Sequence, residues 1–121
     1  MKVAISSQGN DIDALVDPRF GRAGWFIIAD AETGEWTALD NTVNVDAAGG
    51  AGVQAASTVA AQGVQAVITG NVGPNAHKVL AAGHVSIYQA GNGVKARDAM
   101  EALGRGELKA VEAPTVTGHW A

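Results

Sequence analysis

The chain has 121 residues, 12 acidic against 8 basic side chains, a formal net charge of −4 and no cysteine. This length is typical of one domain that can bury a core without covalent staples. The missing cysteines exclude disulfides and thiolate metal ligands. The negative charge argues against a nucleic-acid surface, which needs a basic face. With no 18-residue apolar run and no signal-peptide pattern at the start, we expect a cytoplasmic protein without a membrane span.

The first 41 residues predict a strand followed by a hairpin. Residues 2–6 (KVAIS) indicate a short buried strand, and the polar stretch 7–18 indicates a loop. Two β-rich runs, 25–30 and 35–41, are separated by AETG, and a four-residue connection that ends in glycine is typical of a β-hairpin. We therefore expect three strands here, two of them joined by a tight connection.

The rest of the chain predicts three helices that alternate with strands. A helical pattern runs from GGAG at 49–52 to residue 62, and Gly63 suits its end. Pro74 suits the first position of a helix over PNAHKVLAA. VKARDAMEAL at 94–103 has the apolar stripe of a third helix. Further strands are expected at 66–70 and 85–89, and the tail from residue 107 has strand propensity without an evident partner.

This order of elements predicts a single-domain α/β fold. A hairpin followed by helix–strand units gives a central mixed sheet of five strands flanked by helices, with the later strands parallel. We find no linker that would divide the chain. We therefore expect one cofactor-binding domain over residues 1–110 and a C-terminal tail over 111–121.

The loop before the second strand, DPRFGRA at 17–23, carries two arginines around a Phe-Gly pair. Arg19 and Arg22 could bind an oxyanion, because guanidinium presents a planar fork of charged donors. Phe20 would supply an apolar wall, and Gly21 would let the backbone approach closely. The alternative interpretation is that both arginines form surface ion pairs with the aspartates at positions 11, 13 and 17.

Two glycine-containing helix starts could add backbone donors to such a site. Free N–H groups and the helix dipole attract anions at a helix N-terminus. Neither start has the Gly-Lys-Ser/Thr ending of a P-loop. Because ligands of doubly wound sheets bind beyond the carboxyl ends of the strands, we expect both starts and the arginine loop at one edge. The candidates are Gly50 and Gly52 at the first start, and Asn71, Gly73, Asn75 and His77 at the second.

Other kinds of site are not indicated by the sequence. The histidines at 77, 84 and 119 lack the usual spacing of metal ligands. Ser6 and Ser7 follow a strand but lack the Gly-x-Ser-x-Gly elbow. His119 and Trp120 lie near the end of the tail, which could fold over the crevice or stay apart from it.

Taken in order, these motifs resemble the dinitrogenase iron–molybdenum cofactor biosynthesis family. The resemblance covers about residues 1–110, and its most specific parts are FGRA at 20–23 and TGNVGPNA at 69–76. It implies a ribonuclease-H-like fold. It also implies non-covalent binding of an anionic metal–sulfur cluster rather than catalysis. The lack of cysteine fits a cluster that brings its own sulfides.

The resemblance further implies which cluster and which residues take part. A molybdenum–copper sulfide cluster is the first expectation, and an iron–molybdenum cluster precursor is the alternative. Cluster-delivery or ATPase proteins are the expected partners. The residues implied as cluster-binding are Arg19, Phe20, Gly21, Arg22, Gly50, Gly52, Asn71, Gly73, Asn75 and His77.

Two other functions stay open on the sequence alone. The first is a nuclease or phosphotransferase on the same fold. Against it, the strand KVAIS offers no carboxylate at its centre for a two-metal site. The second is a regulatory or interaction protein without a bound cluster, which the scarcity of direct metal ligands favours.

Overall fold

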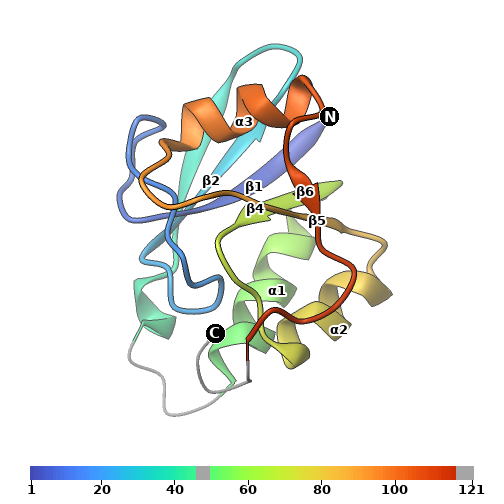
Figure 1. Ribbon diagram of the computed structural model, residues 1–121. Coiled ribbons are helices and arrows are strands. Elements are labelled where there is room, and N and C mark those ends of the chain that lie inside the picture. The colour runs from blue at the N-terminus through green and yellow to red at the C-terminus, as the bar shows by residue number, and fades with distance from the viewer. Residues whose placement is uncertain (46–49, 117–121) are drawn as a thin grey trace.

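A six-stranded mixed sheet forms the centre of the molecule in the computed structural model, which describes residues 1–45 and 50–116 (Figure 1). The strands are β1 (Lys2–Ser7), β2 (Trp25–Asp30), β3 (Trp36–Asp40), β4 (Ala66–Thr69), β5 (Ser86–Gln89) and β6 (Lys109–Ala110). The helices are the 3₁₀ turn η1 (Thr42–Asn44) and the α-helices α1 (Ala51–Ala61), α2 (Pro74–Ala82) and α3 (Ala96–Gly104). The expected α/β class is confirmed.

The strands lie in the order β3-β2-β1-β4-β5-β6. β1, β2 and β3 are antiparallel neighbours, whereas β1, β4 and β5 are parallel. The parallel pairing of the later strands is therefore confirmed. A hydrogen bond from Asp30 N to Glu35 O (2.9 Å) closes the hairpin around residues 31–34, although β3 itself begins at Trp36.

The expected count of five strands was one too low, because β6 adds an antiparallel edge to β5. β6 has two residues, too few to give a pattern that the sequence could reveal. The chain continues along β5, where Val111 N donates to Ile87 O at 2.8 Å. The first residues of the predicted tail are thus attached to the sheet, while His119 and Trp120 lie outside the described residues.

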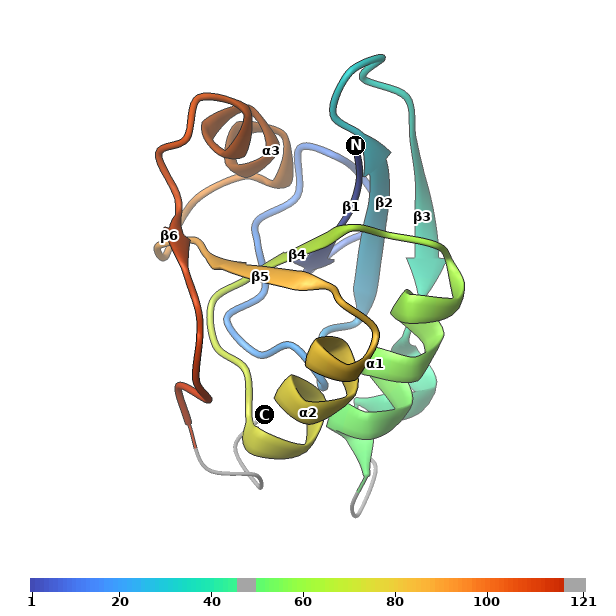
Figure 2. The same cartoon turned by 90° about the vertical axis from the view of Figure 1, so that its right-hand side faces the viewer.

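Both faces of the sheet centre are covered, so β1, β2 and β4 are buried on both sides, whereas the edge strands β3 and β6 are largely exposed. α1 and α2 lie side by side on one face and α3 lies on the other (Figure 2). Phe26 and Val67 belong to the core under α1 and α2, whereas Ile27 and Ile68 belong to the core under α3. This alternation follows from the two-residue period of a strand. It explains why the strands appear as continuous apolar runs in the sequence.

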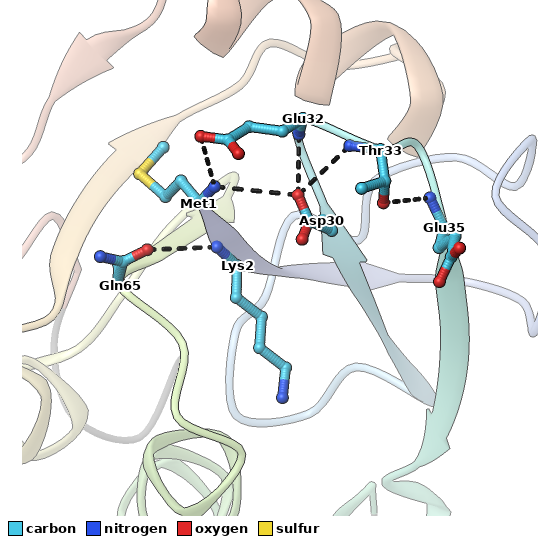
Figure 3. Close-up of polar contacts among 7 residues, drawn as sticks. All are labelled: Met1, Lys2, Asp30, Glu32, Thr33, Glu35 and Gln65. Carbon is cyan, nitrogen blue, oxygen red and sulfur yellow. Dashed lines mark hydrogen bonds and ion pairs between the residues drawn. The ribbon is translucent and has the colours of Figure 1, made fainter.

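Polar contacts hold the N-terminus against the β2–β3 hairpin, as Figure 3 shows. The terminal amine lies 3.8 Å from Asp30 Oδ1 and 3.6 Å from Glu32 Oε1. Asp30 Oδ1 also accepts hydrogen bonds from the backbone N–H groups of Glu32 and Thr33, which are the main causes that lower the pKa of Asp30. These contacts lie at the amino end of β1, on the side of the sheet opposite the carboxyl ends of the parallel strands.

No helix in the described part of the chain has the length and apolar character needed to span a membrane.

Candidate functional site

A crevice of about 320 Å³ lies at the carboxyl ends of β4 and β5. The connection after β4 leads to α2 on one face of the sheet, and the connection after β5 leads to α3 on the other (Figure 2). Two neighbouring parallel strands whose connections leave to opposite faces open a crevice between them, the usual ligand position in such sheets. Its lining residues are Gly70, Asn71, Gln89, Ala90, Gly91 and Asn92.

The arginine loop docks directly beside this crevice. Arg19 pairs with Asn71 in a parallel bridge, and Phe20 N donates to Asn71 O at 3.1 Å. Asn71 Nδ2 donates in return to Pro18 O at 3.3 Å. The loop and the β4–α2 turn therefore meet as expected, through residues that are 53 positions apart in sequence. The second amide proton of Asn71 remains available to a ligand, since an amide nitrogen carries two donors.

A buried pair of hydroxyl groups lies beside the first residue of the arginine loop. Ser6 and Thr69, at the carboxyl ends of β1 and β4, have 0% and 1% of their surface exposed. Ser6 Oγ lies 2.7 Å from Thr69 Oγ1 and 2.8 Å from Asp17 O, and Asp17 N donates to Ser6 O at 2.8 Å. These bonds give both buried hydroxyl groups a hydrogen-bond partner.

The two arginines differ in their surroundings. Arg19 is exposed, and its guanidinium has no hydrogen bond or ion pair within residues 1–45 and 50–116. Arg22 is half-buried, and its Nη1 donates to Val45 O at 3.1 Å. Asp13 pairs instead with Arg97, at 2.8 Å. Among the described residues Arg19 therefore forms no ion pair with an aspartate, although its charge is the smallest of three influences on the pKa of Asp17.

Phe20 does not form the wall of the crevice that the sequence suggested. Its side chain has no exposed surface and packs against Phe26, with ring centroids 5.1 Å apart at 55°. Gly21 is buried too, and its carbonyl accepts a hydrogen bond from Asn41 Nδ2 (3.2 Å). Phe20 anchors the loop in the core under α1 and α2, while Arg19 stays exposed and Arg22 is half-buried.

α1 leads into the amino end of β4, and α2 follows its carboxyl end (Figure 1). Of the residues predicted at the two helix starts, only Asn71 lines the crevice. The N-cap residues of α1 and α2 are Gly50 and Gly73, which have no side chain to accept a hydrogen bond from the first N–H groups of the helix. Gly50 has φ of +76°, a conformation that favours glycine. Gly52 lies in the first turn of α1, and Gly49 lies outside the described residues.

His77 and Asn75 are not brought to the crevice lining. His77 lines a separate depression of about 370 Å³ between α2 and the β5–β6 edge, and Asn75 is exposed in the first turn of α2. The start of α3 is closed to ligands, because Ala96 N and Arg97 N donate to Ala14 O and Ile12 O, both at 2.8 Å.

Five lining residues were absent from the predicted site: Gly70, Gln89, Ala90, Gly91 and Asn92. Gln89 Nε2 donates to Gly70 O at 2.8 Å and so joins the ends of β4 and β5. The sequence did contain a signal for this part of the crevice, because the polar Gln89 ends the predicted strand 85–89 and Gly-Asn-Gly follows at 91–93. Within the described residues, no group of three or more His, Asp or Glu side chains could hold a metal ion. The crevice lining therefore offers hydrogen-bond donors, and the exposed Arg19 lies on the loop that docks beside it.

Burial raises the pKa of Asp17 above its ordinary value of 3.8, against the smaller opposing effect of the hydrogen bond from Arg19 N. The folded-state pKa then exceeds the unfolded one, so ionisation of Asp17 lowers stability as pH rises through the folded pKa. We expect Asp17→Asn, which keeps the acceptor oxygen, to become progressively more stable than the unchanged protein as pH rises from just below 4. Urea unfolding of both proteins across this range measures the difference, and a difference independent of pH would contradict the expectation.

The chain is similar to several known proteins. Residues 1–106 match the family described as dinitrogenase iron-molybdenum cofactor. The apo form of the orange protein from Desulfovibrio gigas is 34% identical, with a TM-score of 0.91 over 95% of this chain and 96% of that one. A candidate NifB protein from Thermotoga is 36% identical, with a TM-score of 0.83 over 97% and 98%. An uncharacterized protein of Methanocaldococcus jannaschii is 34% identical over 92 residues, 74% of this chain and 75% of its own length.

Proposed function

The chain belongs to the dinitrogenase iron–molybdenum cofactor family, and we propose that it binds and carries an anionic metal–sulfur cluster as cargo in the crevice between β4 and β5. The observation that carries this proposal is the exposed Arg19 guanidinium, which has no partner among residues 1–45 and 50–116 and lies on a loop bonded to the crevice residue Asn71. A cation at the rim and amide donors in the lining suit a sulfide-rich anion, which accepts hydrogen bonds through its sulfur atoms.

The donor set favours non-covalent capture. Asn71 and Gln89 each use one amide proton to hold the fold, at 3.3 Å to Pro18 O and 2.8 Å to Gly70 O, and keep a second one. Gly91 and Asn92 add small or polar surface to the same lining. In the part of the chain that the structure describes, no carboxylate lines the crevice, so an anion would meet no like charge from these residues.

We propose molybdenum–copper sulfide as the cargo, with an iron–molybdenum cluster precursor as the alternative. The description of the family, which names iron and molybdenum, supports molybdenum in either case. We also propose that cluster-delivery or ATPase proteins load and unload the crevice, because an open surface site releases its cargo to a partner more readily than an enclosed cavity.

Reconstitution tests the proposal directly. The apo-protein is mixed with tetrathiomolybdate and copper and desalted, and its visible spectrum and metal content are recorded. A retained charge-transfer band with stoichiometric molybdenum and copper is expected. Retention of molybdenum only after addition of iron would favour the alternative cargo. If both metals wash through under every condition, the protein is instead an interaction protein of the same fold.

Arg19→Ala is expected to weaken retention of the cluster by roughly tenfold or more, which is the scale of losing one charged hydrogen bond. Folding stability should stay within about 0.5 kcal/mol, because Arg19 is exposed. Equilibrium dialysis against the same metals measures the change. Arg105→Ala is the matched control: it removes the same charge from an exposed arginine that pairs with Glu107 at the end of α3. Equal retention by the two variants would remove Arg19 from the site.

A further inference from the structure

The turn after β4 is held from both sides, like the middle strand of a three-stranded sheet. Asn71 bonds to the arginine loop, where its carbonyl accepts from Phe20 N at 3.1 Å. Val72, the next residue, bonds in the opposite direction to Thr115, near the end of the described chain. Successive residues of extended backbone point their polar groups to opposite sides, so one turn can join two distant segments.

Thr115 satisfies both backbone groups of Val72. Val72 N donates to Thr115 Oγ1 at 2.9 Å, and Thr115 N donates to Val72 O at 2.9 Å. The Thr115 hydroxyl also lies within donating distance of Val72 O, at 3.3 Å. Val72 has no exposed surface, so its N–H needs a partner from the protein. The hydroxyl of one threonine supplies that partner.

The segment that carries Thr115 lies outside the part of the chain that matches the family, which ends at residue 106. It is nevertheless attached to the fold at two points, by Val111 N to Ile87 O (2.8 Å) and by Thr115 to Val72. Val111 also packs against the core under α1 and α2. This segment, residues 111–116, runs along the sheet edge and ends beside the turn that forms the crevice (Figure 1).

We infer that Thr115 is a positioning residue for the candidate site, so that the segment 111–116 is a working part of it. The inference rests on the proposed function. By pairing with Val72, Thr115 fixes the turn in the orientation that presents Asn71 to the crevice and to the arginine loop. Loss of the hydroxyl frees the turn, and the bond between Phe20 N and Asn71 O then opens more often.

Thr115→Val tests the inference, because valine keeps the shape, removes the acceptor and leaves no room for a replacing water. We expect cluster retention to fall roughly tenfold, the effect of losing a well-placed hydrogen-bonding group. Thr115→Ser should restore retention to within about twofold, and Thr115→Ala, which admits water, should lie between. Thr58→Val is the matched control, since the Thr58 hydroxyl is exposed on α1 and donates to Gln54 O at 2.9 Å, away from the turn.

A second readout needs no cluster. Hydrogen exchange of the Phe20 amide, followed by NMR, should speed up by roughly tenfold in Thr115→Val, while the amide of Ile27 in β2 keeps its rate. If the unchanged protein binds no cluster, the proposed function fails, and the Phe20 amide alone decides whether Thr115 positions the turn. Unchanged exchange at Phe20, or full cluster retention by Thr115→Val, would overturn the inference.

Discussion

Replacing Gly70 with alanine is expected to lower the free energy of unfolding by about 3 kcal/mol, at the upper end of the usual cost of overpacking. A Cβ at this position would lie 2.6 Å from Pro18 Cα and 3.0 Å from Pro18 O. Both are backbone atoms, so no side chain can turn away to make room. The arginine loop would have to move off the β4–α2 turn. Urea unfolding measures the loss, and the cluster retention of the variant should fall with it.

Gly91→Ala is the matched control for this prediction. Gly91 lines the same crevice, but no heavy atom lies within 4 Å of the Cβ that alanine would add. Its unfolding free energy should stay within about 0.5 kcal/mol of the unchanged protein. A similar stability of the two alanine variants would mean that the loop does not rest on Gly70, and the described geometry of the site would be wrong.

The second large effect is expected for Phe20→Ala, which should cost about 3–5 kcal/mol of unfolding free energy, as for other buried phenylalanines. Phe20 is fully buried against Phe26, and its loss leaves a cavity under the arginine loop. Phe20→Leu should cost less, because it retains much of the buried volume. Thermal or urea unfolding of both variants gives the comparison.

Phe20→Ala also separates two roles for this residue. As a core residue, Phe20 should affect stability first and cluster retention only through the loop. As a wall of the site, it would affect retention with little change in stability, which would restore the interpretation drawn from the sequence. Val43→Ala serves as the control, because Val43 is 84% exposed and its truncation should change stability by less than about 0.5 kcal/mol.

Most of the secondary structure could be predicted from local patterns. Glycine and proline marked the ends of elements, as Pro74 does at the start of α2, and apolar runs marked the strands. β6 could not be predicted, because a two-residue strand exists only through its pairing with β5. α3 begins at Ala96, two residues later than its pattern suggested, since its first N–H groups bond to the loop at Ile12 and Ala14.

The site was predicted in part, and there is a physical reason why some of its residues could be found from the sequence and others could not. The type and order of the residues indicated an arginine loop and a glycine-containing turn, and the topology of an α/β sheet placed them at one edge. Which side chains face the crevice depends on contacts between segments far apart in the chain. Packing against Phe26 turned Phe20 inward, and the position of α2 directed His77 to another depression.

The sequence by itself determined the α/β class, the parallel strands and the presence of an arginine loop and a polar turn, because periodicity and turn chemistry are local properties. Only the tertiary structure decided that Gln89 and Asn92 complete the crevice, that Asp17 is buried and that Thr115 reaches Val72. Each of these depends on strand order and on which connections leave to which face of the sheet. Those are long-range choices that no window of residues records.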